Sequence, residues 1–450
     1  MVRFLLVVTT AVICSAQDAT TDLNRQIAEL RDLVLKLQTR IDDLEKRSPP
    51  QPTAKDAVVA STPPIQNAPT PSAPPTSALA GLLENTTFNF LFDGYYGFNF
   101  NSPIGRTNLL RAYDVSSNSF SLNQADVVIE NAVDPEQGKH FGARLDLQFG
   151  QATATLQGSA VNEPRPDIYR NIFQAYGTFA PNKKLTLDFG KWSSSIGLEG
   201  NYTQDQINYS RSYLFDFLPF YHMGVRAAYK VNDALTLNYW IDNGTQQTEA
   251  FNNYKDQLFG FAAQPHKNLS WTVNYYLGQE HPDVIYFPYS NPPGLPTIQG
   301  ESFEPIIPAP KGKTDIFDSY ATWQPTDRLT FAFEADYEIE RLQTTSQPVH
   351  VDGGAFYTHY QLTKRVALAG RTEYLSDRGG LYSGTTQALK ETTLTTEYKV
   401  ASGFAVKLEW RRDFSNQRYF LTDALGLLSK EQTTATVGVV WWFGKKTGPW

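Results

Sequence analysis

The chain has 450 residues, a formal net charge of −7 and 41% hydrophobic residues. After the first sixteen positions no apolar run is long enough for a membrane-spanning helix, and the negative charge without a basic cluster disfavours nucleic-acid binding. Aromatic residues make up 13% of the chain, against one cysteine and two methionines. This composition is typical of transmembrane β-barrels, in which alternate residues face lipid and aromatic girdles mark both interfaces.

Residues 1–16 are expected to be a cleaved secretory signal peptide. Arg3 precedes an apolar run over 4–13, and Cys14, Ser15 and Ala16 are small residues at the cleavage positions. The alternative is a lipoprotein cysteine at Cys14, although the preceding isoleucine is large for that signal. Cleavage after Ala16 leaves no cysteine in the mature chain, and therefore no disulfide or metal thiolate.

Residues 17–47 are expected to form a coiled-coil helix, followed by a Pro-rich linker at 48–80. Apolar side chains recur at alternating spacings of four and three, at Leu23, Ile27, Leu30, Val34, Leu37, Ile41 and Leu44. This heptad predicts self-association through residues 22–47, as a dimer or, because Leu33 widens the apolar stripe, a trimer. The alternative is a lone amphipathic helix, since the segment is short.

Residues 81–450 are expected to form a closed antiparallel transmembrane β-barrel, an all-β fold. Strands with apolar residues on one face and polar residues on the other recur throughout, as in 87–100, 140–150 and 328–340. About sixteen strands can be counted, separated alternately by short turns and long loops. Short periplasmic turns and long external loops give this rhythm, and an even strand count would put both termini, and with them the coiled coil, in the periplasm. In the second strand, at 118–130, a bulge near Asn123 is needed to restore the phase.

The last strand, 433–443, carries apolar residues at its odd positions and ends in Trp441 and Phe443. It is similar to the C-terminal signal by which outer-membrane barrels are delivered to their assembly machinery. We expect this strand to pair with both the first strand and the preceding one, which closes the barrel and leaves no edge. The tail 444–450 is interpreted as lying outside this signal, because Pro449 cannot donate to a ladder. The alternative is that Trp450 is the terminal aromatic of the signal.

From about residue 90 onward the chain resembles the putative β-barrel porin-2 family of Gram-negative outer-membrane proteins. The motifs that carry the resemblance are Gly-Tyr-Tyr at 94–96 with Asn99, and the stretches 118–125, 142–146, 188–191, 208–212 and 219–226. The resemblance implies a porin-like barrel and carries over no substrate, cofactor or catalytic residue. The C-terminal half is similar in its strand rhythm more than in its motifs.

A barrel of this size leaves an aqueous lumen, and the strand phase predicts which polar side chains face it. The inward set is Arg144, Asp146, Gln148, Thr186, Asp188, His222, Arg226, Lys230, Asn238, Asp242, Glu334, Asp336, Glu338, Arg371, Glu373, Lys407, Glu409 and Arg411. The basic members fall mainly on the strands expected at 140–150, 222–231, 364–375 and 403–412, and the acidic members concentrate on the strand at 328–340. Opposed rows of charge would create a transverse field in a pore. The alternative is that they are solvated lumen charges without selectivity.

The connection 193–221 is too aromatic for a loop that extends into water. Tyr209, Arg211 and Asp216 are its candidate pore-lining residues. We expect this connection to fold into the barrel as a constriction; the alternatives are an outer rim or a subunit interface. The other conspicuous connection, 279–313, is rich in proline and is interpreted as an external cap.

The sequence predicts an outer-membrane porin for passive diffusion of small hydrophilic solutes, embedded in the lipid bilayer. The rivals are a substrate-specific channel for sugars or organic acids and a non-conducting structural or adhesive protein. The six histidines show no metal-ligand spacing, and no nucleophile or phosphate-binding motif is found, so no enzyme activity, metal or cofactor is expected.

The heptad predicts that the detergent-solubilised protein is an oligomer whose subunit number falls when residues 17–78 are removed, because that deletion removes the a and d positions. Mass measurement of both forms by light scattering tests this. An unchanged monomer in both preparations would exclude the coiled-coil assignment.

Overall fold

The computed structural model describes residues 86–157, 163, 165–281, 311–342 and 345–445, together with the backbone of 285–289, 297–298 and 301–306. The predicted signal peptide, coiled coil and linker, and the end of the tail at 446–450, lie outside the described residues.

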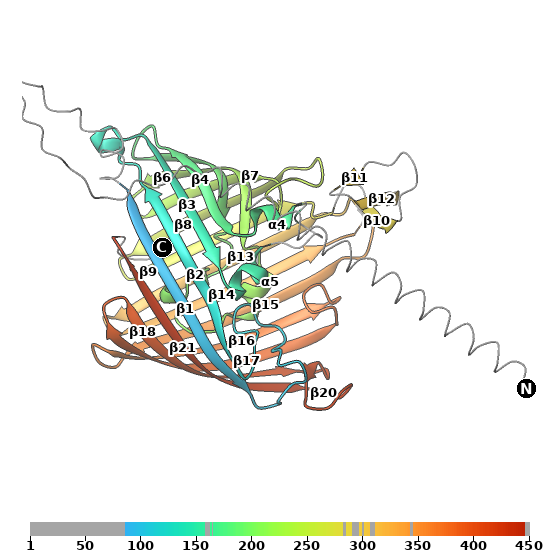
Figure 1. The fold of residues 1–450 in the computed structure, drawn as a ribbon. Helices are drawn as coiled ribbons and strands as arrows, with labels where there is room; N and C mark the ends of the chain where they lie inside the picture. Colours follow the sequence, from blue (N-terminus) through green and yellow to red (C-terminus); the bar gives the residue numbers. More distant parts are fainter. Residues whose placement is uncertain are drawn as a thin grey trace, which may run out of the picture. The chain divides into compact units, whose positions relative to one another are not determined.

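Sixteen antiparallel strands form a closed barrel, each paired with its neighbours in chain order (Figure 1). They are β1 (Thr87–Asn99), β2 (Ser119–Asn131), β3 (Phe141–Phe149), β4 (Ile172–Phe179), β5 (Leu185–Ser193), β6 (Tyr221–Asn232), β7 (Leu235–Asp242), β8 (Asp256–His266), β9 (Leu269–Gly278), β13 (Thr314–Thr326), β14 (Leu329–Glu340), β15 (Val349–Gln361), β16 (Val366–Arg378), β17 (Gln387–Ala401), β18 (Phe404–Ser415) and β21 (Glu431–Gly444). The predicted fold class is therefore confirmed.

Short elements occupy the connections. The helical ones are η1 (Pro135–Gln137), α3 (Gln151–Leu156), α4 (Pro166–Tyr169), η2 (Thr203–Asp205) and α5 (Tyr213–Phe217). The extended ones are β10 (Ile285–Tyr289), β11 (Thr297–Ile298) and β12 (Glu301–Ile306), which form a small sheet, and the pair β19 (Phe420–Leu421) and β20 (Leu428–Ser429). Within the described ranges, no helix is long and apolar enough to cross a membrane.

Alternation along each barrel strand separates an apolar outer face from a polar inner face. In β1, Phe92 is 46% exposed on the outside, whereas the adjacent Asp93 is 0% exposed on the inside. The period of two places every second side chain toward lipid, which explains the large exposed aromatic residues. The predicted phase of the inward residues therefore holds in the strands on which the site is built.

The closure of the barrel joins β21 to β1 and β18. Phe443 pairs with Phe90 in the first strand, and their rings stack with centroids 4.9 Å apart. On the other side, Trp441 pairs with Phe404. The last strand therefore pairs with the first strand and with the preceding one, as predicted, and no barrel edge is left unpaired.

The bulge predicted in the second strand is also confirmed. Asp93 pairs with Gln124, and the next pair joins Gly94 to Leu122, so that Asn123 is the extra residue. The bulge turns Asn123 inward, where its side-chain amide donates to Asp93 Oδ2 over 2.6 Å.

Two connections contain short elements of their own. α4 occupies the turn before the fourth strand, which begins at Ile172. Pro166 stands at the start of α4, where its fixed φ favours a helical turn. The connection 279–313 was interpreted as an extended cap, and it contains the three-stranded sheet β10, β12 and β11.

We expect a chain that ends at Gly444 to assemble like the full chain, because the pairing of β21 with β1 already reaches Gly444 opposite Asn89. Heat-modifiable gel mobility of the outer-membrane fraction measures assembly. A chain that ends before Trp441 is the matched control and should fail. Failure of the Gly444 chain would instead assign the assembly signal to Trp450.

Candidate functional site

The connection between β5 and β6, residues 194–220, contacts inward-facing side chains of several strands; we call it the internal segment. Its element η2 contacts β21, and α5 contacts β15 and β16. Figure 1 shows α5 among these strands. Ser212 begins α5 by accepting a hydrogen bond from the Phe215 N–H over 3.0 Å, a usual N-terminal cap. The segment therefore enters the barrel with ordered local structure.

Two inward carboxylates each accept hydrogen bonds from two successive backbone N–H groups of the internal segment. Glu409 on β18 accepts from Tyr209 over 2.6 Å and from Ser210 over 2.9 Å. Glu373 on β16 accepts from Tyr213 over 2.8 Å and from Leu214 over 2.7 Å. Hydrogen bonds to a charged acceptor are the stronger kind, so these contacts set where the segment lies.

Cationic side chains of the same strands bind the carbonyl groups of the segment. Arg371 donates to the Ser210 carbonyl over 2.8 Å, Arg411 donates to the Arg211 carbonyl, and Lys407 donates to the Gln206 carbonyl. Their charges are balanced by carboxylates. Arg371 forms ion pairs with Glu391 on β17 and with Glu199 in the internal segment. Arg411 forms an ion pair with Asp413 on its own strand.

Tyr209 joins the segment to the strands where the barrel closes. Its hydroxyl donates to Asp93 Oδ1 on β1 over 2.8 Å. Its ring lies against Gly438 on β21, where an added Cβ would come within 2.3 Å of ring carbons. Thr203 also donates to Asp93, over 2.7 Å. Only a residue without a side chain allows the ring to approach β21 this closely.

On the side of β3, Tyr202 reaches the ion pair formed by Arg144 and Asp146. Arg144 Nε and Asp146 Oδ1 are 2.9 Å apart, and the Tyr202 hydroxyl hydrogen-bonds to both residues. Gln174 on β4 also donates to Asp146, over 2.5 Å. The segment is thus hydrogen-bonded to strands on both sides of the barrel closure, to β1 and β3 on one side and to β16 and β18 on the other.

Arg211 acts within the segment and its surroundings. Its guanidinium donates to the carbonyls of Gly200, Tyr209 and Asn201 and lies 4.5 Å from the centre of the Tyr113 ring. The side chain is 1% exposed. Its role in this structure is therefore to hold the loop in shape, because water scarcely reaches the charge.

The structure separates the sequence-predicted site residues into a buried set and an accessible set. The buried residues are Arg144, Asp146, Asp188, Tyr209, Arg211, His222, Glu334, Asp336, Arg371 and Arg411. Asp216, Arg226 and Glu338 are partly exposed, and Lys230 is exposed. Arg226 forms an ion pair with Asp188 over 2.7 Å, and Lys230 forms one with Asp233 at a turn.

Residues outside the predicted site also hold the interior together. Arg111, in the connection between β1 and β2, pairs with Asp114 and with Asp413 on β18, both over 2.5 Å. Asp413 lies in phase with Arg411, and strand periodicity extended by one step would have placed it inside. The local sequence around Arg111 carried no comparable signal, because the loop has no period.

Ser194, His222 and Asp242 lie in the order of a hydrolase triad. Ser194 Oγ is 3.1 Å from His222 Nε2, and His222 Nδ1 is 3.6 Å from Asp242 Oδ2. The second distance is too long for a hydrogen bond. His222 is 0% exposed, and Ser194 Oγ accepts from the Ile196 N–H over 3.1 Å. The hydrogen bonds of Ser194 to His222 and to the Ile196 N–H hold the start of the internal segment.

A model of the family described as "Putative beta-barrel porin-2, OmpL-like" matches residues 85–443. The chain belongs to this family. The family match includes all sixteen barrel strands except the last residue of β21, and the coiled-coil and linker ranges precede it. In this porin-2 member, the motif at 208–212 that carried the resemblance lies within the internal segment.

Solved porin structures share the fold. An anion-selective porin from Comamonas acidovorans is 8% identical, with a TM-score of 0.51, and the match covers 80% of this chain and 99% of that chain. The outer membrane channel DcaP of Acinetobacter baumannii is 9% identical, with a TM-score of 0.50, and the match covers 80% and 97%. Such identities show the fold alone. The comparison with curated sequences gave no significant match.

Asp216 in α5 should make the free energy of unfolding depend on pH. Although Asp216 is partly exposed as a residue, desolvation by the protein atoms around its carboxyl group raises its pKa to about 6 from 3.8; the Tyr382 hydroxyl, which donates over 2.8 Å, opposes the rise. The folded chain then holds the proton more tightly than the unfolded chain. The free energy of unfolding should therefore fall as the pH rises from about 4 to about 6.

We expect Asp216→Asn to remove this part of the pH dependence, because the amide cannot ionise. Urea unfolding midpoints in detergent, followed by tryptophan fluorescence at several pH values between 4 and 7, measure it. Asp423→Asn, in an exposed loop, is the matched control. If the wild type and Asp216→Asn lose stability in parallel over this range, the assignment is wrong.

Proposed function

We propose that this outer-membrane porin-2 barrel allows passive diffusion of small hydrophilic solutes past a constriction formed by the internal segment. A barrel of sixteen strands is wide enough to enclose an aqueous passage, whereas about eight strands would be filled by side chains. The observation that carries the proposal is the attachment of the segment to Glu373 and Glu409. A segment held there would narrow the barrel at a defined position.

The charges that remain accessible would meet the solute. Arg226 and Lys230 lie on β6, and Glu338 lies on β14. Side chains of opposite sign on separate strands would create a transverse field that orders water in the passage. The rings of Tyr209, Tyr213 and Phe215 are buried, which supports simple diffusion over a sugar-specific channel with a stacking track.

One observation favours a second candidate, a non-conducting barrel with a plugged interior. Most of the predicted lumen charges, including Arg371 and Arg411, are buried against the internal segment. A plug would use inward charges in the same way. Reconstitution into planar bilayers separates the two, since a plugged barrel gives no channel events.

Two regions of the chain, residues 22–47 and the last strand, suit interactions with partners. We propose that the assembly machinery of the outer membrane reads the last strand, and that residues 22–47 lie in the periplasm and mediate self-association. These assignments rest on the heptad and on the position of the barrel termini at the rim of the short turns.

Deleting residues 204–215 should raise the single-channel conductance and the solute size limit, because it removes the anchored part of the segment. Conductance in planar bilayers and liposome swelling with sugars of increasing size measure both quantities. Deletion of 423–426, at an exposed loop, is the control and should change neither. Unchanged conductance in the 204–215 deletion would contradict the constriction, and no channel events from the wild type would favour the plug.

A further inference from the structure

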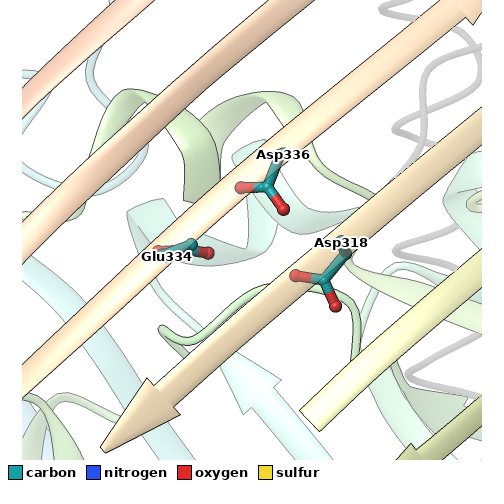
Figure 2. Close-up of side chains that lie close together, drawn as sticks. All are labelled: Asp318, Glu334 and Asp336. Atoms are coloured by element: carbon teal, nitrogen blue, oxygen red, sulfur yellow. The ribbon is translucent and has the colours of Figure 1, made fainter. Parts of the chain in front are cut away.

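Three inward carboxylates converge on the side of the barrel formed by β13 and β14. Asp318 on β13 pairs directly with Asp336 on β14, and Glu334 lies two residues before Asp336 on the same inner face. One oxygen atom of each residue lies within 4.8 Å of the others. Figure 2 shows the three side chains directed toward a common point.

The cluster is buried and lacks a compensating cation. Asp318, Glu334 and Asp336 are 0%, 4% and 7% exposed. Among the described residues, neither lysine nor arginine forms an ion pair with them. Elsewhere in the interior, the carboxylates Glu391 and Asp413 pair with arginine. Burying like charges without compensation is costly, so this cluster requires a bound positive charge or protons.

Asp336 points independently to a ligand. Glu334 accepts hydrogen bonds from the Leu198 N–H over 2.8 Å and the Tyr357 hydroxyl over 3.0 Å, and Asp318 accepts one from Asn274 over 2.7 Å. Neither oxygen of Asp336 receives a donor from outside the cluster, although the side chain is more than nine-tenths buried. A buried carboxylate without donors is uncommon unless something else binds it.

We propose that Asp318, Glu334 and Asp336 bind a divalent cation of the calcium class. The ligand atoms are all carboxylate oxygens, which suit a hard cation. Calcium accepts irregular arrangements and completes its shell with water, whereas magnesium demands octahedral geometry and gives up its waters reluctantly. The sequence shows no metal-ligand spacing here, because strand pairing, and not local spacing, brings Asp318 to Asp336.

The site lies beside the first residues of the internal segment. Leu198 donates to Glu334, and the Ser195 carbonyl accepts hydrogen bonds from Asn274 over 3.0 Å and from Tyr320 over 3.3 Å. A bound cation would orient the carboxylates that these residues contact. Binding should therefore stabilise the folded barrel; any effect on conductance rests in addition on the proposed function.

Terbium luminescence and calcium competition test the site in the detergent-purified full chain. Tyr320 lies on β13, which also carries Asp318, and Tyr357 lies on β15, which pairs with β14. Both tyrosines can sensitise the luminescence of a bound lanthanide. We expect saturable terbium binding that calcium displaces at about 10⁻⁴ to 10⁻³ M, the range of extracellular calcium modules. Magnesium should compete less well, and calcium should raise the thermal unfolding temperature.

Asp336→Asn should weaken calcium binding by about tenfold or more, since even changes outside the ligand shell cost that much in metal sites. Glu338→Gln is the matched control, because Glu338 lies on the same strand and inner face but outside the cluster; it should leave binding unchanged. Absence of saturable binding by the wild type would overturn the proposal in favour of shared protons. Equal loss in both variants would also overturn it.

Discussion

The interior of this barrel depends on one constraint, the need of buried backbone groups for hydrogen-bond partners. A loop that enters a barrel leaves water behind, and its N–H and C=O groups must be satisfied there. Glu409 and Glu373 each accept from one pair of successive amides, at 209–210 and 213–214, while Arg371, Arg411 and Lys407 donate to carbonyls. Strands β16 and β18 thus act as a charged template for the internal segment.

This constraint changes how the inward charges are interpreted. In an open pore, they would be solvated and would act on passing ions. Here Arg371 and Arg411 are bound to carboxylates and to the segment, so their charge is largely neutralised. The accessible charges are fewer and lie mainly on β6 and β14. Asp318, Glu334 and Asp336, which lack a lysine or arginine partner among the described residues, form a separate acidic region on β13 and β14.

Much of the barrel could be predicted from the sequence, because a strand period of two is a local signal. It predicted the strands, the inward side of Glu409 and Arg411, the bulge at Asn123 and the closure through Phe443. The site could be predicted only in part. Aromatic density marked the internal segment, but its hydrogen bonds to Glu373 and Glu409 join residues about 160 to 200 positions apart, and no local pattern encodes them. The pairing of Asp318 with Asp336 likewise follows from register.

Amide hydrogen exchange of the reconstituted protein tests the central claim most directly. Peptides covering 205–218 contain the N–H groups of Tyr209, Ser210, Tyr213 and Leu214, which donate to buried carboxylates. If the segment is held inside the barrel, these amides should exchange as slowly as those of β16 and β18. Exchange as fast as that of the exposed loop 422–427 would contradict the account.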